Sequence, residues 1–320
     1  MGKHENSISP LSHKKKEGNF MTDQTYILYN PFAGNGAGKQ EAELLTVMYP
    51  DAKLYDMTEI SAYSEFFEKI DPDNPVILCG GDGTLNRFIN DTDCISIKND
   101  LYFLSTGSGN DFVRDIGKEK GGSPTFRINR YLCNLPCVEI NGKTTRFLNG
   151  IGYGIDGYCC EEGDRLRGQT EKPVNYTSIA IKGLLFHFQP RSAVITVDGK
   201  QHTYNKVWLA PTMNGRYYGG GMMVAPNQQR LGGKGKVSVV VLHDSSKLKT
   251  LCVFPSIFKG EHIKHKKIVD VFTGQDIRVE FDRPTPLQID GETIRNVTSY
   301  RVMSAAALAY EKKREKKSRC

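Results

Sequence analysis

This 320-residue sequence lacks several features that would assign it to a membrane-spanning, secreted or metal-stabilised class. No apolar run reaches the roughly 18 residues that a transmembrane helix needs, and the chain opens on a polar stretch instead of a signal-type segment. Its eight cysteines show no regular spacing and no CxxC motif with a partner motif. This pattern argues against both a zinc knuckle and a disulfide framework. We therefore expect a reduced, cytoplasmic protein.

Two nucleotide-binding signatures are missing or incomplete. No G-x-G-x-x-G follows the first apolar run with an acidic partner about twenty residues further on, which argues against a classical dehydrogenase. The stretch "NPFAGNGAGKQ" at 30–40 is glycine-rich and contains the Gly-Lys pair of a Walker A loop, Gly38-Lys39. However, Ala33 stands at the position of its first glycine, and Gln40 stands where the magnesium-binding Ser or Thr belongs. This glycine-rich turn is therefore not a Walker A loop by itself, and the rest of the chain must explain it.

The net charge of +7 lies at the two ends of the chain. Residues 312–319 carry six basic groups and one acid, residues 1–22 carry four lysines and two glutamates, and the body between them is neutral. A neutral body argues against a nucleic-acid partner. Basic ends fit weak attraction to an anionic membrane, worth about 1 kcal/mol per Lys or Arg, but a solvated tail explains them equally well. We expect residues 1–21 to be a disordered extension.

The first half of the chain alternates short apolar runs with glycine-rich turns. The runs open the segments "YILYNP" (26–31), "VILCGGDG" (76–83) and "YFLSTGSG" (102–109), and they fit strands buried on both faces of a parallel sheet. Between them, 39–49 and 59–70 have the apolar spacing of helices. This alternation predicts an α/β domain over 22–130, with ligands bound beyond the carboxyl ends of its strands.

After about residue 125 the pattern becomes that of a β domain. Asn141-Gly142, Asp198-Gly199 and Asp290-Gly291 are turn dipeptides beside alternating runs, which predicts hairpins. Within this half only 175–188 has a helical pattern. We therefore predict an all-β, sandwich-like or barrel-like domain over 131–300. Residues 301–320 are predicted to form a C-terminal segment that packs on the first domain and ends in a basic tail.

The most informative stretch is "GGDGTLN", residues 80–86. Its glycines let backbone N–H groups approach phosphate oxygens, and a helix N-terminus following them favours negative charge. Asp82 is the exception, because phosphates repel a carboxylate unless it positions magnesium or takes a proton. A plain Asp-Gly turn is the structural alternative for this stretch.

Seven motifs, in this order, resemble the diacylglycerol kinase catalytic domain family, which includes bacterial lipid kinases and is related to the sphingosine kinases. The resemblance spans about residues 25–300. It implies a parallel α/β domain like that of NAD kinases and diacylglycerol kinases, followed by a β-rich lipid-substrate domain. The motifs are "NPFAGNGAG", "GGDGTLN", "STGSGNDFVRDIG", "NGIGYGID", "MNGRYYGGGMMVAP", "FKGEHIKHKKI" and "PLQIDGE".

The resemblance gives the 30–40 turn its interpretation as the first nucleotide-contacting turn of the family. It implies that ATP is the cofactor and that the other glycine turns hold its phosphates. In the family, the "NDFVR" segment closes the site. The nucleotide-binding residues implied are Asn30, Pro31, Phe32, Ala33, Gly34, Thr58, Gly80, Gly81, Asp82, Gly83, Thr84, Leu85, Asn86, Thr106, Gly107, Asn110, Asp111 and Arg114.

Four residues are candidates for catalysis. The resemblance implies that the "DGE" motif supplies the base that deprotonates the lipid hydroxyl, and we favour Glu292, with Asp290 orienting it or a magnesium-bound water. Asp82 is a third candidate, because it matches the base proposed for the sphingosine kinases. Lys182 matches a family lysine that faces this region. An exposed lysine on a helix is the structural alternative.

Two segments need separate interpretation: one departs from the family's motif pattern, and the other has more than one interpretation. In the bacterial diacylglycerol kinases an Asp-Gly after "VAP" helps to hold a structural magnesium ion. Here the Asp position corresponds to Gly232, with Arg230 and lysines around it, so the metal ligands stay unassigned. The lysines of "FKGEHIKHKK" (258–267) discourage a metal site, and this segment is a polar face or a contact with lipid headgroups.

The sequence thus predicts an ATP- and Mg²⁺-dependent lipid kinase that phosphorylates diacylglycerol or a similar membrane lipid alcohol. Such an enzyme would lie at the periphery of an anionic membrane. One alternative is an NAD kinase, which shares the "GGDGT" turn. The other is a non-catalytic lipid- or nucleotide-binding regulator with the same fold, favoured by Gly232. A homodimer is compatible with the sequence, which does not determine the oligomeric state.

Overall fold

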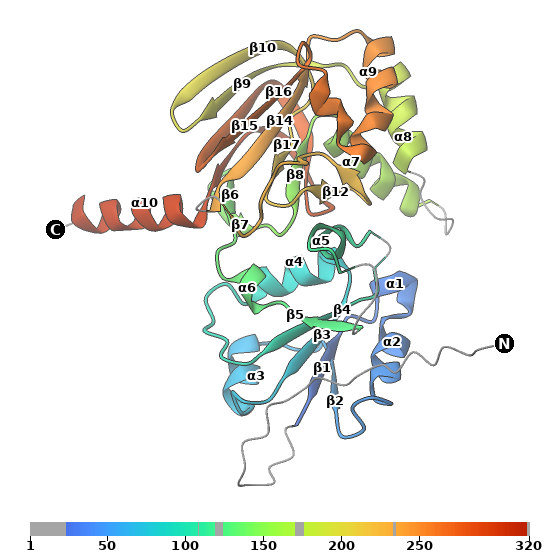
Figure 1. Cartoon of the computed structure of the whole chain (residues 1–320), viewed down its shortest axis with the longest axis vertical. Coiled ribbons are helices and arrows are strands. Elements are labelled where there is room, and N and C mark those ends of the chain that lie inside the picture. Colours follow the sequence, from blue (N-terminus) through green and yellow to red (C-terminus); the bar gives the residue numbers. More distant parts are fainter. Residues whose placement is uncertain (1–23, 108, 119–123, 170–175, 233–234, 319–320) are drawn as a thin grey trace. The chain divides into compact units, whose positions relative to one another are not determined.

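The structure is a computed structural model that describes residues 24–318 except 108, 119–123, 170–175 and 233–234 (Figure 1). The predicted N-terminal extension lies outside the described residues. The chain divides into two compact units, residues 1–133 and 134–320. The domain limits predicted from the sequence stay predictions. Within the described part of the chain, no helix combines the length and the apolar character needed to cross a bilayer.

The first unit is a five-stranded sheet in the order β2-β1-β3-β4-β5. The first four strands are parallel, and β5 is antiparallel to β4. The apolar runs predicted as buried strands form β1, β3 and β4, and every residue of β3 is buried. The elements are β1 (Tyr26–Tyr29), α1 (Ala33–Gly36), α2 (Gly38–Leu45), β2 (Lys53–Asp56), α3 (Tyr63–Lys69), β3 (Val76–Gly80), α4 (Asp82–Asp91), β4 (Leu101–Ser105), α5 (Asp111–Asp115), β5 (Thr125–Arg127) and α6 (Asn129–Leu132).

Helices cover both faces of this sheet because alternate strand residues point to opposite sides. On one face, Ile27 and Ile77 pack with Leu45 of α2. On the other face, the ring of Phe103 meets that of Phe112 of α5 at 6.2 Å between centroids. Burial on both sides explains why the strands are continuous apolar runs rather than alternating ones. The α/β prediction for the first half is confirmed.

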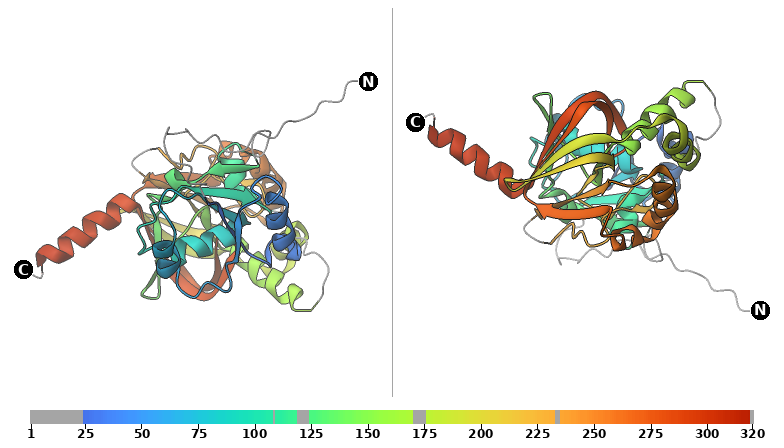
Figure 2. Two further views of the ribbon diagram at one scale, coloured as in Figure 1. Left: turned by 90° about the horizontal axis from the view of Figure 1, so that it is seen from below. Right: turned by 90° about the horizontal axis from the view of Figure 1, so that it is seen from above.

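The second unit is a ten-stranded sheet that closes on itself. The ring runs β16-β8-β11-β14-β10-β9 and returns to β16, because β9 pairs with the first part of β16 and β8 with its last part. Figure 2 shows these strands curving around one another. Their inward residues, including Ile195, Val239 and Val279, belong to one buried core. The strands are β6 (Cys137–Ile140), β7 (Lys143–Arg146), β8 (Gly150–Tyr153), β9 (Arg191–Val197), β10 (Lys200–Leu209), β11 (Thr212–Met213), β14 (Val237–His243), β15 (Val269–Gly274), β16 (Asp276–Ile289) and β17 (Glu292–Met303), with a separate pair β12 (Tyr217–Tyr218) and β13 (Met222–Met223).

All three predicted Asx-Gly hairpins are confirmed. The dipeptides connect β6 to β7, β9 to β10 and β16 to β17, each an antiparallel pair. Both residues of each turn have positive φ, as at Asp290 (46°) and Gly291 (96°). Aspartate, asparagine and glycine tolerate this left-handed conformation, which is why such dipeptides predict the turn.

The predicted β-rich, sandwich-like second domain is confirmed, but the expectation that only 175–188 is helical in this half was wrong. Helix α7 has 13 residues and begins directly after β8, and α9 follows β14. The predicted helical segment forms α8 and the π-helical turn η1. The bounds are α7 (Ile155–Arg167), α8 (Tyr176–Lys182), η1 (Gly183–His187), α9 (Lys247–Val253), and the 3₁₀ segments η3 (Phe254–Lys259) and η4 (Glu261–Lys264).

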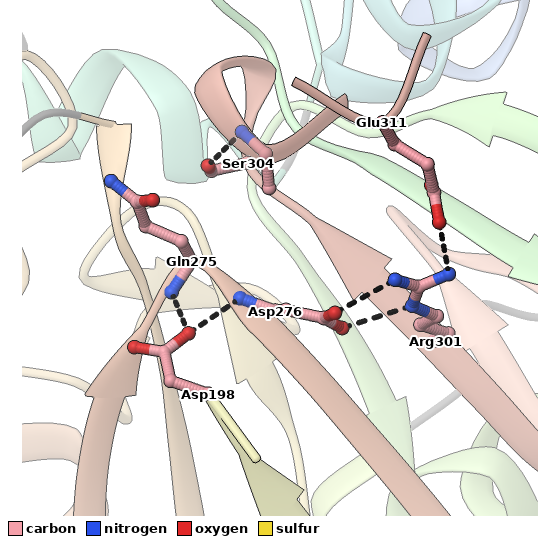
Figure 3. Close-up of polar contacts among 7 residues, drawn as sticks. Asp198, Gln275, Asp276, Arg301, Ser304 and Glu311 are labelled. Atoms are coloured by element: carbon pink, nitrogen blue, oxygen red, sulfur yellow. Dashed lines mark hydrogen bonds and ion pairs between the residues drawn. The ribbon is translucent and has the colours of Figure 1, made fainter. Parts of the chain in front are cut away.

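Within the predicted C-terminal segment, strand β17 ends at Met303 and helix α10 (Ala305–Ser318) follows. Arg301 of β17 donates to both carboxylate oxygens of Asp276 and to Glu311 of α10, and it thereby links the helix to the sheet (Figure 3). Asp198 of the β9–β10 turn accepts from the backbone N–H groups of Gln275 and Asp276, which joins that hairpin to the start of β16. The packing of this segment on the first domain stays a prediction.

Candidate active site

Four predicted nucleotide-binding turns lie at one edge of the first unit's sheet. They follow the carboxyl ends of β2, β1, β3 and β4, which are adjacent parallel strands in that order. In open α/β sheets this edge is where ligands bind. The structure therefore brings together residues that the sequence separates by up to about eighty positions.

The glycines of these turns allow three backbone segments to touch. A Cβ built on Gly107 would lie 2.7 Å from the Cα of Gly81, so neither turn can carry a side chain at the contact. A Cβ on Gly34 would lie 2.8 Å from the carbonyl oxygen of Thr106, and one on Gly38 only 1.9 Å from that of Asn30. The opening turn "NPFAGNGAGKQ" is therefore one wall of a three-part backbone site.

Two side chains link the first turn to helix α4. The Asn30 amide donates to the hydroxyl of Thr84 at 2.9 Å, and its oxygen accepts from the backbone N–H of Phe32 at 3.0 Å. Thr84 also lies very close to Gly80, because a Cβ built on Gly80 would be only 2.4 Å from the Cβ of Thr84. These contacts explain why Asn, Gly and Thr stand at these positions without invoking a bound ligand.

Asp82 is the first residue of α4 and also holds the start of α5. Its two carboxylate oxygens accept from the backbone N–H groups of Asp111 at 2.8 Å and Phe112 at 3.2 Å. Asn110, just before α5, adopts a left-handed conformation (φ 51°), and its side-chain oxygen accepts from the Ser105 hydroxyl. Asp82 is therefore a positioning residue for the "NDFVR" segment, in which Asp111 is buried and Arg114 half-buried.

The site also contains polar groups that fit a phosphate ligand. The Thr106 hydroxyl oxygen is buried and has no hydrogen-bond partner among the described residues. The first N–H groups of α4, at Asp82, Gly83 and Thr84, belong to a helix N-terminus, where no intrahelical acceptor exists. Thr58 follows β2 in a turn in which the Asp56 carboxylate accepts from its N–H and its hydroxyl, at 2.8 and 2.7 Å.

In the second unit, the "DGE" hairpin gives its two acids different environments. Asp290 accepts from the backbone N–H groups of Leu148, Asn149 and Gly150 at 2.5, 2.8 and 2.9 Å. Glu292 is exposed, and the described residues provide its side-chain carboxylate with no hydrogen bond or ion pair. Asp290 therefore fixes the hairpin against the start of β8, while Glu292 is available to a ligand.

The residues present do not fit the structural magnesium site that the resemblance to bacterial diacylglycerol kinases brings into question at Gly232. Arg230 donates to the carbonyl oxygen of Leu148 and, at 2.8 Å, to the side-chain oxygen of Asn149. Asn214 donates to the same carbonyl at 2.8 Å. A guanidinium on these oxygens, with Gly232 in place of a carboxylate, leaves no set of acidic ligands. Among the described residues, no three His, Cys, Asp or Glu side chains cluster in a way that could hold a metal.

The "NGIGYGID" motif is a packing motif, and its aspartate is the residue that sequence reasoning missed. A Cβ on Gly154 of the motif would lie 2.5 Å from the carbonyl oxygen of Trp208. A Cβ on Gly157, directly after the motif, would lie 1.8 Å from that of Pro286, so α7 packs directly on β16. Asp156 is buried, with Tyr218 as the hydrogen-bond partner of its carboxyl, while its Oδ2 has no partner among the described residues. Burial raises the pKa of the Asp156 carboxyl to about 7, and the Tyr218 hydrogen bond opposes the rise. The signal available in the sequence for this residue was an aspartate at the end of an otherwise apolar motif.

The remaining candidates lie on the helices of the second unit. Lys182 is exposed at the end of α8, and among the described residues no hydrogen bond or ion pair joins it to the "DGE" hairpin, so its catalytic role stays a prediction. In the "FKGEHIKHKK" segment, His262 is buried and lies 2.9 Å from the carbonyl oxygen of Val224. Burial lowers the pKa of His262 to about 4, so it is neutral at physiological pH. The lysines of this segment are exposed.

Comparison with known proteins assigns the class of this chain. Residues 24–131 match the diacylglycerol kinase catalytic domain, and residues 149–309 match the YegS C-terminal NAD kinase beta sandwich-like domain. The resemblance predicted from the motifs is thus confirmed. The chain belongs to the diacylglycerol kinase catalytic domain family, with the bacterial, YegS-like lipid kinases.

Individual relatives are distant. A protein named diacylglycerol kinase from Mycobacterium tuberculosis is 26% identical over 195 residues, which are 59% of this chain and 61% of that protein. The chain thus spans less than two thirds of that relative's length. YtlR of Bacillus subtilis, classed with the lipid kinases, is 24% identical over 252 residues, 72% of this chain and 77% of that one. A Bacillus anthracis structure assigned to the diacylglycerol kinases has a TM-score of 0.65 at 19% identity, covering 91% of this chain and 95% of that chain, which shows a shared fold.

Proposed function

We propose that this protein transfers the γ-phosphoryl group of ATP to the hydroxyl of diacylglycerol or a similar membrane lipid alcohol. The observation that carries the proposal is the contact between the "GGDGTLN" and "STGSG" turns at Gly81 and Gly107. Without side chains there, backbone N–H groups can meet phosphate oxygens. Family membership supports the kinase class, and the acceptor is our inference.

The nucleotide would lie along the four turns of the first unit. Thr84 and the first N–H groups of α4 would face the phosphates, and the unpartnered Thr106 hydroxyl would donate to one of them. Phe32, which exposes 78% of its surface, would offer a flat apolar side chain to the base. Mg²⁺ would arrive with the nucleotide and offset phosphate charge, as phosphoryl transfer requires.

The acceptor hydroxyl would lose its proton to Glu292. Its oxygen would then form a bond to the γ-phosphorus as the bond to the β-phosphate oxygen breaks, giving a phosphorylated lipid and ADP. Glu292 is the one of the two "DGE" carboxylates that no backbone group holds. Asp290 would position it by fixing the hairpin to residues 148–150.

Replacing Gly83 by alanine is expected to affect nucleotide binding and folding in opposite directions. A Cβ at Gly83 meets nothing within 4 Å, and an alanine within helix α4 should stabilise the fold by up to about 1 kcal/mol. If phosphates occupy the open space beside Gly83, ATP affinity should fall about tenfold or more, because hydrogen bonds to charged groups are worth about 1.5–3 kcal/mol. Calorimetric titration with ATP and thermal denaturation test both parts. Arg87→Ala, an exposed change on the same helix, is the control that should leave ATP affinity unaltered.

The deciding experiment is phosphate transfer from labelled ATP with magnesium to a panel of lipids in mixed micelles, with NAD as a further acceptor. A labelled lipid that disappears with Asp82→Ala would support the proposal and identify the acceptor. Labelled NADP would instead make the protein an NAD kinase. ATP binding without any product would favour a non-catalytic regulator, for which Arg230 and Gly232 would be the first positions to restore.

A further inference from the structure

Four large apolar side chains project into solvent from neighbouring helical segments of the second unit. Phe186 of η1 exposes 70% of its surface and Leu248 of α9 exposes 74%, while Ile181 of α8 and Phe258 of η3 expose 44% and 42%. We call these four side chains and their helices the helical face. Single exposed apolar residues are ordinary, but four on adjoining segments call for an explanation.

The segments of the helical face are held together from behind. Ala180, Leu184, Val253 and Ile257, which come from α8, η1, α9 and η3, belong to one buried core. The Lys247 ammonium group also donates to the carbonyl oxygen of Leu185 at 3.3 Å, which ties the start of α9 to η1. In Figure 1, α8 and α9 lie beside each other, in agreement with these contacts. The exposed side chains are thus presented by a fixed surface.

The charge of the helical face is almost entirely positive. The segments of the helical face together with the residues that directly follow η3, that is 176–188 and 247–267, contain seven lysines and one glutamate. That glutamate, Glu261, already pairs with Lys264 at 2.8 Å. Lys249 and Lys259 stand next to Leu248 and Phe258 in the sequence, and both are exposed. Exposed apolar side chains with lysines beside them are the pattern of a surface that lies in the interface of an anionic membrane.

We propose that the helical face docks on the surface of an anionic lipid bilayer. Phe186, Leu248, Ile181 and Phe258 enter the boundary between headgroups and acyl chains, and the lysines contact lipid phosphates. A protein partner would need acidic groups set opposite each lysine, whereas an anionic bilayer offers negative charge everywhere. This inference deepens the proposed function, because a kinase for a membrane lipid must reach its substrate in a bilayer.

The first test is sedimentation with vesicles of phosphatidylcholine and phosphatidylglycerol. A Phe186→Ser, Leu248→Ser variant should bind these vesicles about a hundredfold more weakly, since each side chain contributes roughly tenfold or more through buried apolar surface. The matched control is Leu44→Ser, Val47→Ser, at the end of α2 and just beyond, whose side chains expose 64% and 80%. That control should bind like the unchanged protein. Equal binding by both variants would overturn the proposal.

The second test addresses the lysines. A Lys249→Gln, Lys259→Gln variant should lose about fivefold in affinity per lysine on the anionic vesicles. The same loss on vesicles of phosphatidylcholine alone would contradict an electrostatic contact with the bilayer. Kinase activity on a short-chain, water-soluble diacylglycerol keeps the two proposals apart. Weakened docking with unchanged soluble activity supports docking, whereas vesicle binding without any kinase activity would contradict only the proposed function.

Discussion

Replacing Glu292 by glutamine is expected to lower kcat by about 10²–10⁴-fold while leaving the melting temperature unchanged. A general base contributes about this factor to proton transfer, and glutamine cannot accept the proton. Glu292 is exposed and its carboxylate has no hydrogen bond or ion pair within the described structure, so losing that carboxylate should not weaken the fold. Steady-state kinetics with a lipid acceptor and thermal denaturation measure the two halves of this expectation.

Asp290→Asn is the matched comparison within the same hairpin. The carboxylate of Asp290 accepts three backbone N–H groups, and an asparagine would turn its amide hydrogens toward some of them. Each buried donor left without an acceptor costs about 1–3 kcal/mol, so this variant should lose stability as well as activity. A Glu292→Gln variant that keeps its kcat would rule Glu292 out as the base and make Asp82 the next candidate.

The fold was predictable where its determinants are local. Buried strands followed by glycine turns, and hairpins with Asx-Gly dipeptides, depend on residues within a few positions of one another. The ring closure of β9 on β16 was not predictable in this way, since it pairs Val197 with Ile277. Helix α7 was missed because Gly157 and Gly163 weaken its helical pattern. Both glycines are required by packing, against Pro286 and Tyr176 respectively.

In the candidate site, too, local features were predictable from the sequence and long-range contacts were not. The motifs identified which residues belong to it, but not what each side chain does. Asp82 accepts from the backbone of Asp111 and Phe112, which lie 29 and 30 positions later in the sequence. Asp290 accepts from backbone more than 140 positions earlier. Arg230 contacts Leu148, 82 positions away. Such long-range partners give no periodic or compositional signal, so positioning and catalytic acids look alike in the sequence.

Asp156→Asn is expected to make folding less sensitive to pH between about pH 4 and pH 7. The pKa of Asp156 is raised from 3.8 to about 7, mainly by burial. The folded state therefore binds a proton more tightly than the unfolded state does. The stabilising contribution of the protonated carboxyl is complete below about pH 4 and is lost as the pH rises toward 7, by up to about 1.4 kcal/mol per pH unit. Asparagine is neutral throughout and should lack this loss.

Among the described residues, the titratable neighbours that shift the pKa of Asp156 provide no compensating positive charge. Tyr218 donates its hydrogen bond to this carboxyl, and burial raises the pKa of Tyr218, Cys159 and Cys160, that of Cys160 to about 12. All three are thus neutral where Asp156 titrates. Denaturant unfolding at several pH values should show the Asn variant gaining stability over the unchanged chain as the pH rises. Parallel curves would contradict a raised pKa.

Tyr218→Phe tests the same raised pKa of Asp156 by raising it further, whereas Asp156→Asn removes the titrating group. Removing the hydroxyl takes away the one hydrogen bond that favours the charged carboxylate, so the pKa of Asp156 should rise further and the loss of stability should extend above pH 7. In the Asp156→Asn background the same tyrosine change should have no pH-dependent effect. A pH dependence that survives in the double variant would place the titrating group elsewhere, because burial of Asp156 could not then be its origin.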